Sequence, residues 1–202
     1  MEVFLVPSDV ELINDFLNGN IQSFNRLAIK WQKNLFGFAY RYTGNEEEAK
    51  DICQKALIKA YKNLHNLKNS GSFSSWIYQI TINLCKDEVK KRKNKNHIPY
   101  NENKMDDENS SVELISGDSP QIKSLEKKNI KEIIRFALNS IPEEQKIVII
   151  MKEYQGLKFT EIAEILKCSV NTIKSRMYYG LNNMKEKLLK SNIGKEEILY
   201  EM

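Results

Sequence analysis

Apolar residues recur at helical spacing along most of the chain, and this pattern predicts an all-α protein. The clearest case is residues 156–184, where two short apolar runs are separated by a polar break at residues 167–169. Steps of three and four residues place the apolar side chains on one face of each helix. Ser169 is a suitable N-cap residue for the second helix. The stretch therefore predicts two short helices joined by a tight turn, which is the helix-turn-helix plan.

The two faces of the second helix differ in chemistry. One face is expected to form a buried stripe, made of Val170, Ile173, Met177, Leu181, Met184 and Leu188. The remaining surface carries side chains of the kinds that contact base edges and phosphates, namely Asn171, Thr172, Lys174, Ser175, Arg176, Tyr178, Tyr179 and Asn182. Such a helix could enter the major groove of DNA, and the alternative is a solvated helix in an ordinary helical core.

Residues 1–95 predict four further helices. Three of them have capping signals at their start, which are Ser8 with Glu11, Asn20, and Asn45 with Glu48. Gly19 and Gly44 are expected to end the first two helices. The fourth helix is predicted over residues 73–93 and leads into a basic cluster of Lys90, Lys91, Arg92, Lys93 and Lys95. This cluster exceeds what the helix dipole requires, so we favour contact with phosphates over simple solvation.

Residues 96–119 differ from the rest in composition. Asn, Asp, Glu and Ser dominate there without helical periodicity, which predicts a flexible linker. Ser119 and Pro120 are expected to open the next helix, and Pro142 the one after it. Only residues 1–6 have a pattern that could suit a strand. The sequence thus predicts two helical domains, residues 1–95 and 120–190, followed by a short tail of residues 191–202.

The charge is distributed unevenly between these segments. Residues 1–95 carry a net charge of +5, residues 96–124 carry −4, and residues 125–202 carry +3. Two basic lobes on either side of an acidic connector suit two separate contacts with a polyanion such as a nucleic acid.

Several function classes find no support in the sequence. The three cysteines, Cys53, Cys85 and Cys168, are far apart and lie in helical apolar patterns, which predicts free thiols rather than disulfides or a zinc site. His65 and His97 have no partner at metal-ligand spacing, and the common nucleotide-binding and hydrolase motifs are absent. We expect no catalytic residues, metal, cofactor or small-molecule substrate. The absence of a long apolar run or a secretory signal predicts a cytoplasmic protein without membrane insertion.

The order of these parts resembles the sigma-70 family of bacterial transcription initiation factors. The resemblance is carried by NEEEAKDICQKALIKAYKNL, then GSFSSWIYQITINLCKDEVKKRK, and after the linker IPEEQKIVIIMKEYQGLKFTEIAEILKCSVNTIKSRMYYGL. The chain looks most like the extracytoplasmic-function (ECF) group, which keeps only the domains called region 2 and region 4. The resemblance implies a non-enzymatic partner of core RNA polymerase that directs it to promoter DNA.

The resemblance also implies roles for individual residues. Asp51 and Gln54 match the helix face that binds the clamp helices of the largest polymerase subunit. Leu67 and Asn83 match the pocket for a flipped base of the minus-ten element, with Lys68, Asn69, Ser70 and Gly71 in the adjoining loop. Trp76 is expected to lie in the core rather than to stack on a base.

The predicted helix-turn-helix would read the minus-thirty-five element. The matching positions are Asn171, Thr172, Lys174, Ser175, Tyr178 and Tyr179, while Arg176, Lys158 and Phe159 would hold backbone phosphates. Asn171 replaces a frequent glycine, and Tyr179 with Gly180 stands where arginine and alanine are common, so the promoter sequence is not predicted. The family further implies control by an anti-sigma factor, often membrane-anchored, that sits between the two domains.

Two other functions are weighed against an alternative sigma factor. The first is a conventional helix-turn-helix regulator that binds an operator without polymerase, with a sensing or dimerising first domain. The second is an RNA-modifying enzyme or nuclease, for which the sequence offers no acidic or histidine cluster at metal spacing.

Overall fold

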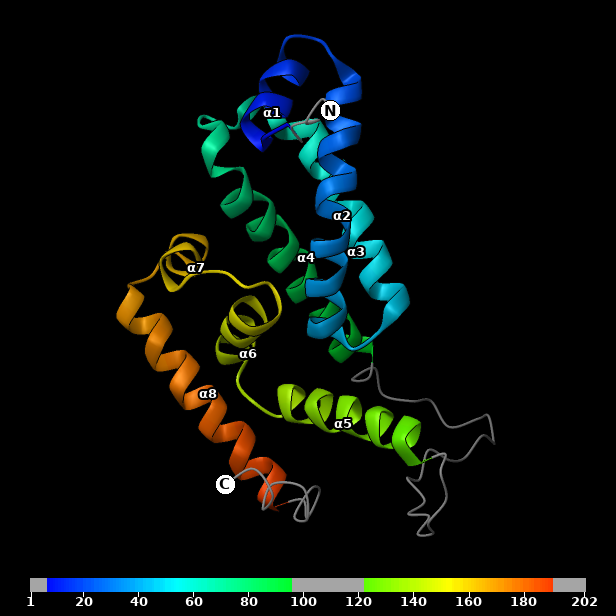
Figure 1. The fold of residues 1–202 in the computed structure, drawn as a ribbon, viewed down its shortest axis with the longest axis vertical. Helices are drawn as coiled ribbons and strands as arrows, with labels where there is room; N and C mark the ends of the chain where they lie inside the picture. The colour runs from blue at the N-terminus through cyan, green and yellow to red at the C-terminus, as the bar shows by residue number, and fades with distance from the viewer. Residues whose placement is uncertain (1–6, 96–121, 191–202) are drawn as a thin grey trace, which may run out of the picture.

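The computed structural model describes residues 7–95 and 122–190, and within these ranges the chain is helical without a strand. The N-terminal half contains α1 (Asp9–Leu17), α2 (Ile21–Thr43), α3 (Glu46–Asn63) and α4 (Phe73–Lys95), with two 3-10 turns, η1 (Leu64–Asn66) and η2 (Ser70–Ser72), before α4. The C-terminal half contains α5 (Ile122–Asn139), α6 (Glu143–Ile149), the π-helical turn η3 (Ile150–Tyr154), α7 (Phe159–Leu166) and α8 (Val170–Lys190). The predicted all-α class is confirmed (Figure 1).

Local capping chemistry sets most helix boundaries. Ser8 and Glu11 form a full capping box at the start of α1, and the Asn20 side chain accepts a hydrogen bond from the N–H of Gln22 at the start of α2. Gly19 and Gly44 end α1 and α2 with φ of 98° and 75°, in the left-handed region that glycine adopts without strain.

Other predicted boundaries need adjustment. The Asn45 side chain caps α3 through the N–H of Glu48, but the Glu48 carboxylate pairs with Arg92 of α4 instead of completing the predicted capping box. Pro142 precedes the first helical residue of α6 rather than occupying it. The predicted strand at residues 1–6, the helix start at Ser119 and Pro120, and the tail lie outside the described residues.

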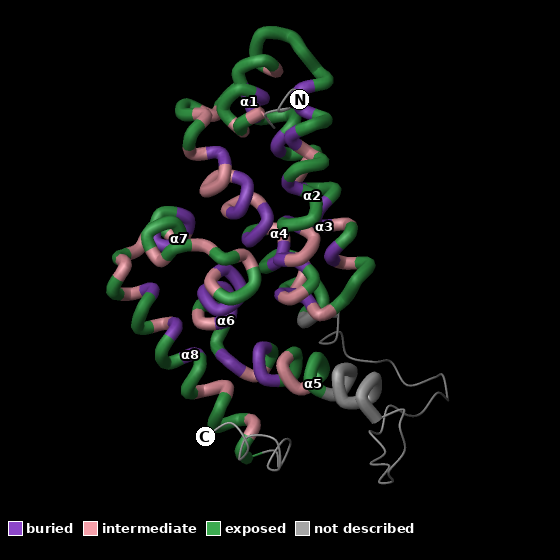
Figure 2. Tube along the Cα trace, viewed as in Figure 1, coloured by how far each residue is buried: buried purple, intermediate pink, exposed green. Residues whose placement is uncertain are grey.

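The core of the N-terminal half is built around α2. This helix packs against α1, α3 and α4, and its inner face carries Leu35, Phe38 and Ala39, all fully buried. The indole of Trp31 is also buried, and its N–H donates to the Asp9 carboxylate at 3.0 Å. Figure 2 shows the buried residues running along the inner sides of α2, α3 and α4.

The C-terminal half packs α8 against α5, α6 and α7. Its core residues Ile147, Ile162 and Ile173 are almost completely buried. The two halves also pack against each other, because α4 contacts α7 and α2 contacts η3. Buried apolar residues of both halves consequently form one continuous cluster, with α7 beside the middle of α4 (Figure 1).

The predicted buried stripe of α8 is partly wrong. Ile173 and Met177 are buried, and Val170, Met184 and Leu188 are half-buried, but Leu181 is 46% exposed. Gly180 takes the buried position, since a Cβ atom there would lie 2.8 Å from Cδ1 of Ile149. The glycine allows α6 to approach α8 closely.

Candidate nucleic-acid interface

The turn between α7 and α8 has the geometry expected of a helix-turn-helix. Lys167 ends α7 in the left-handed conformation with φ of 53°, and the N–H of Cys168 donates to the carbonyl of Ala163 at 3.1 Å. The Ser169 hydroxyl then accepts a hydrogen bond from the N–H of Thr172 at 3.0 Å, which caps α8 as predicted. The start of α8 is therefore held in a defined position relative to α7.

The outward surface of α8 is polar and aromatic near its N-terminal half. Tyr178 and Tyr179 are 63% and 58% exposed, with ring centroids 5.6 Å apart in an edge-to-face arrangement. Lys174, Ser175 and Asn171 are exposed on the same helix. This surface presents amide, hydroxyl, phenol and ammonium groups, which are the groups that contact base edges and phosphates.

Two of the predicted contact residues are already engaged within the protein. The half-buried Thr172 places its hydroxyl 2.9 Å from that of Ser169. The Arg176 guanidinium forms an ion pair with Glu144 of α6 at 2.5 Å and lies 3.8 Å from the sulfur of Cys168. To bind a phosphate, the Arg176 guanidinium must either leave the Glu144 carboxylate or contact both groups at once.

The start of α7 lies in the same half of the protein. Lys158 is exposed, and its N–H donates to the Glu161 carboxylate at 2.6 Å. Phe159 is half-buried beneath the Lys152 ammonium, which lies 5.0 Å from the ring centroid. Of this pair, Lys158 is placed to contact a phosphate with its side chain, whereas the Phe159 ring belongs to the packing around α7.

The loop at residues 67–71 joins η1 to α4 in the N-terminal half. The Asn69 side chain accepts a hydrogen bond from the N–H of Gly71 at 2.9 Å, and the Ser70 hydroxyl donates to Asn14 of α1 at 3.2 Å. Leu67 is half-buried, while Lys68 is exposed. The loop is therefore anchored at both Asn69 and Ser70, with Lys68 free to reach a ligand.

The remaining predicted DNA contacts of this half follow α4 along its length. Asn83 is exposed ten residues after the start of α4, which is about 15 Å along the helix. Lys90 and Lys91 are exposed further on, and Lys91 pairs with Glu88 at 3.5 Å. Arg92 donates to the carbonyl of Thr43 at 3.4 Å in addition to its ion pair with Glu48, so this cation supports the fold.

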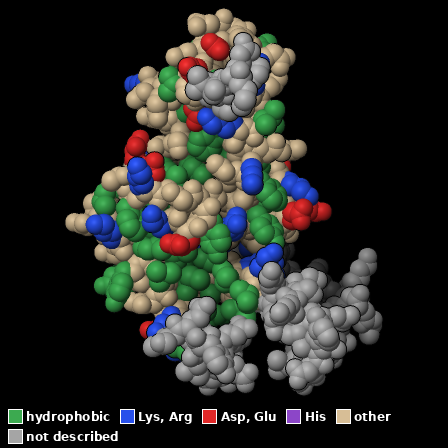
Figure 3. All heavy atoms as spheres, viewed as in Figure 1, with side chains coloured by type: hydrophobic (Ala, Val, Ile, Leu, Met, Phe, Trp, Pro, Cys, Tyr) green, Lys and Arg blue, Asp and Glu red, His purple; other side chains and the backbone are tan. Residues whose placement is uncertain are grey.

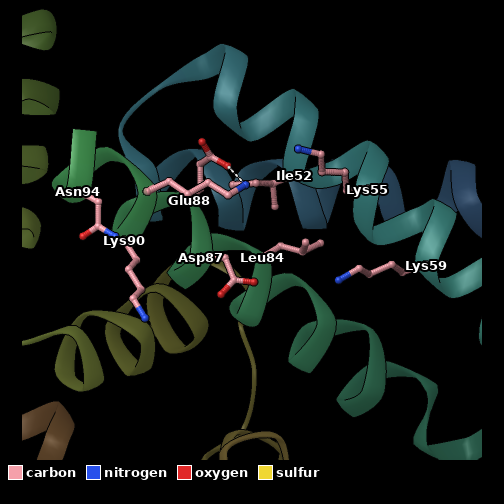
Figure 4. A pocket seen from close by; sticks show the side chains of 9 residues that line it. Ile52, Lys55, Lys59, Leu84, Asp87, Glu88, Lys90 and Asn94 are labelled. Atoms are coloured by element: carbon pink, nitrogen blue, oxygen red, sulfur yellow. Dashed lines mark ion pairs between the residues drawn. The ribbon is translucent and has the colours of Figure 1, made fainter. Parts of the chain in front are cut away.

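A shallow hollow of about 470 Å³ lies between α3 and α4 (Figure 4). Its floor contains Ile52 and Leu84, and its rim carries Lys55, Lys59, Asp87, Glu88, Lys90, Lys91 and Asn94. Lys55 was expected to face solvent or a partner, whereas Lys59 was not singled out from the sequence. The spacing of four residues between them on α3 is the signal that would have placed Lys59 on the same face.

Asp51 and Gln54, the predicted polymerase contacts, lie on the outer side of α3. The Asp51 carboxylate pairs with the Lys55 ammonium one turn later, and both side chains remain about half exposed. Gln54 is exposed beside them. The two residues thus belong to one accessible surface that continues toward the rim of the hollow.

Exposed apolar side chains gather on the C-terminal half, where Figure 3 shows them on the lower part of the face. The exposed apolar residues of this half include Ile130 and Phe136 on α5 and Leu181 and Leu189 on α8, each between 41% and 46% exposed. Exposed apolar groups gathered in this way are typical of surfaces that contact another protein.

Side chains that could bind a metal ion are not clustered in the described part of the chain. Its three cysteines are free, and burial raises the pKa of the Cys53 and Cys85 thiols. Within residues 7–95 and 122–190 there is no cluster of three or more His, Cys, Asp or Glu side chains suited to a metal ion. No helix in these ranges is long and apolar enough to cross a membrane.

The family profiles match both halves of the chain. The profile described as Sigma-70 region 2 matches residues 27–95, and the profile described as Sigma-70, region 4 matches residues 131–184. Together they cover more than half of the 202 residues and fall on α2–α4 and on α5–α8.

Curated relatives agree with these profiles. The chain is 28% identical to the ECF RNA polymerase sigma-E factor of Haemophilus influenzae over 185 residues, covering 90% of this chain and 95% of that protein. It is 27% identical to the RNA polymerase sigma-H factor of Pseudomonas aeruginosa over 180 residues, covering 84% and 88%.

Two solved structures share the fold. CnrH, solved in complex with the cytosolic domain of CnrY, superposes with a TM-score of 0.65 at 17% identity, over 89% of this chain and 96% of CnrH. The sigma factor RpoE of Bartonella quintana, solved with the anti-sigma factor NepR, superposes with a TM-score of 0.60 at 20% identity, over 84% and 98%. With two successive regions of one family in a single chain, the protein belongs to the sigma-70 family and to its ECF group.

Proposed function

We propose that this ECF sigma factor binds core RNA polymerase and directs it to promoters by contacting the minus-ten element with its N-terminal half and the minus-thirty-five element with its C-terminal half. The observation that carries the proposal is the presence of two separate exposed polar surfaces in one chain. One is the outward face of α8 around Lys174 and Tyr178, and the other is the loop at residues 67–71 with Asn83 of α4.

Each surface has a distinct task in the proposal. The exposed side chains Asn171, Lys174, Ser175, Tyr178 and Tyr179 would read base edges in the major groove. Leu67, Asn83 and the loop would hold an unstacked base, with Lys90 and Lys91 on nearby phosphates. The protein would act by binding alone, in the cytoplasm where polymerase and DNA meet.

We place the polymerase contact on α3. Asp51 and Gln54 are accessible on its outer side, and the hollow between α3 and α4 lies next to them. A partner helix lying along α3 would meet a mixed charged rim over an apolar floor, which suits a protein partner as well as DNA phosphates.

An anti-sigma factor is the proposed regulator. The support is the fold shared with RpoE, whose structure was solved with the anti-sigma factor NepR, together with the apolar side chains exposed on α5 and α8. Co-purification of a protein that blocks polymerase binding would identify this regulator.

Reconstituted transcription tests the function. The purified full-length chain is mixed with core polymerase and a library of genomic fragments, and transcript 5′ ends are sequenced. We expect polymerase to be retained in a pull-down and discrete start sites to appear that core polymerase alone does not produce. Specific DNA binding without polymerase, combined with failure of both assays, would instead support an operator-binding regulator.

A further inference from the structure

A lysine is buried where the two halves of the protein meet. Lys146 of α6 is only 8% exposed, and its ammonium donates to the backbone carbonyl of Tyr42 in α2 at 2.5 Å and to the Asn139 side chain at 2.7 Å. The same ammonium lies 5.0 Å from the centroid of the Tyr42 ring. Charged groups are rarely buried unless they are paired, and these hydrogen-bond acceptors are neutral. Lys146 is therefore a costly group that both halves combine to accommodate.

Other polar contacts cross the same boundary, which we call the seam. The Tyr78 hydroxyl of α4 donates to the Gln155 side chain at 3.1 Å, and Lys86 of α4 pairs with Glu143 of α6 at 3.1 Å. The Arg41 guanidinium of α2 lies 4.3 Å from the centroid of the Tyr154 ring. Together with the packing of α4 on α7 and of α2 on η3, these contacts hold the halves in one arrangement.

The ionisation of Lys146 reflects its position in the seam. Its pKa is lowered to about 8, mainly by burial and also by the nearby Arg92, whereas Cys85 and Glu143 act in the opposite direction. Separation of the halves would remove Tyr42 from the ammonium and return it to water. Opening the seam therefore restores the hydration of the Lys146 ammonium, and closing it removes that hydration.

The closed arrangement is too short for the proposed task. The names of the two promoter elements place them about 25 base pairs apart, which is about 85 Å along B-DNA. In the structure, α4 is 23 residues long, or about 35 Å, and α7 lies against it. The longest path from residues 67–71 to the start of α8 runs along all of α4, across one helix diameter, and then along α7 and its turn. These lengths add up to about 65 Å, which is an upper limit on the distance between the two surfaces. The halves must separate to contact both elements.

We propose that the seam is an intramolecular latch that closes the free protein, and that the buried Lys146 keeps this latch weak enough to open when the protein meets polymerase and promoter. The need for opening rests on the proposed function, whereas the closed state rests on the contacts alone. A buried ammonium serves this purpose because closing the seam strips water from the charge, a desolvation cost that an apolar residue of similar size does not carry.

The experiment measures the distance between the halves in the full-length chain without polymerase or DNA. Spin labels are attached at Asn25→Cys on α2 and Asn182→Cys on α8, both exposed positions, in a Cys168→Ser background. Lys146→Glu should shift the distance distribution to longer values, because a carboxylate would face the Tyr42 carbonyl and Glu143. Lys146→Met should concentrate the distance distribution at its short, closed value, because this change removes the buried charge and keeps an apolar side chain of similar length.

The opposite response of these two variants is decisive. If both shift the distance in the same direction, or if neither changes it, the latch is overturned. Circular dichroism checks that each variant folds, and the exposed ion pair between Lys86 and Glu143 provides a second test. Glu143→Lys should increase the open population a few-fold by repelling Lys86, and adding Lys86→Glu should restore it. Failure of the double variant to restore closure would also contradict the latch.

Transcription separates this proposal from the function on which it rests. With core polymerase limiting, Lys146→Met should reduce promoter-specific transcripts several-fold relative to the parent chain. If none of the variants supports transcription while the distances respond as described, the sigma function fails and the latch stands. If transcription is specific but insensitive to the distance, the latch has no regulatory role.

Discussion

At the scale of single residues, exposure decides which predicted contacts remain available. Lys174 and Tyr178 are exposed on α8, whereas Arg176 and Arg92 are held by Glu144 and Glu48. Helical periodicity placed all of these outside the apolar stripe, but it does not show which cation finds a carboxylate on another helix. That pairing depends on how α6 and α3 are packed, which is a property of the fold.

Lys174 offers a test of base readout. Lys174→Ala should cost about 1–3 kcal/mol of promoter binding and relax the preference at one position of the minus-thirty-five element, if the ammonium contacts a base edge. Binding of the polymerase complex to a set of promoter variants measures this effect. Lys185→Ala, at another exposed position of α8, serves as the control. Equal weakening on every sequence would make Lys174 a phosphate contact instead.

Asp51 tests the polymerase surface in the same way. Asp51→Arg should weaken binding to core polymerase at least tenfold, because it reverses a charge and releases Lys55 on the accessible side of α3. Titration of labelled protein with core polymerase gives the affinity, and circular dichroism verifies the fold. Asp15→Arg on α1 is the matched control at an exposed site. An affinity equal to that of the parent chain would remove Asp51 from the interface.

At the scale of helices, capping residues in the sequence correctly predicted where most helices begin. How the helices pack against one another did not follow from these local signals. The caps at Ser8, Asn20 and Ser169 use side chains within three residues, so the sequence contains all the information they need. Leu181 was assigned to the buried stripe because it is apolar and correctly spaced. Its exposure follows from the position of α6 over Gly180, and a residue without a side chain leaves no trace in a hydrophobic pattern.

Gly180 therefore provides a test at this scale. Gly180→Val should lower the free energy of unfolding by about 1–3 kcal/mol, because the added atoms would push against Ile149 and Gln145 of α6. Thermal unfolding followed by circular dichroism measures the loss. Asn182→Val, on the exposed side of the same helix, controls for the effect of a branched residue on helix propensity. Equal stability of the two variants would argue against close packing at Gly180.

At the scale of the whole molecule, the arrangement of the two halves was beyond sequence reasoning. The resemblance implied two domains and a linker, while the structure packs α4 against α7 and buries Lys146 where the two halves meet. A lysine between the polar first turn of α6 and the apolar run that follows it gives no indication of its partners. Tyr42 lies 104 residues earlier in the chain, and only the fold brings its carbonyl to the ammonium.

The pKa of Lys146 predicts how closure depends on pH. Below pH 8 the side chain is charged in both arrangements, whereas above its lowered pKa of about 8 it is neutral only when buried, so closing then releases a proton. Raising the pH from about 7.5 to about 9 should favour the closed form by up to about eightfold. Distances between the spin labels, measured across this pH range, should show the closed population rising. Lys146→Met should abolish this rise.

The groups that face Lys146 limit the useful range of that measurement. Arg92, Glu143, Cys85 and Tyr42 also face the Lys146 ammonium. Burial raises the pKa of Cys85 and Tyr42, so opening would let these groups ionise nearer their ordinary pKa values of 9.0 and 10.0, which opposes closure at the upper end of the range and beyond it. A closed population that falls between pH 7.5 and 9 would contradict the assignment of the titration to Lys146.

The single apolar cluster that joins the halves also has a calorimetric consequence. Elements that share one core lose their packing together, so heating the parent chain should give one endotherm whose van't Hoff and calorimetric enthalpies agree. Lys146→Glu should divide this endotherm into two, one for each half, because the halves would then melt independently. The sigma factor would behave in isolation as one cooperative unit and become two units when it starts to work.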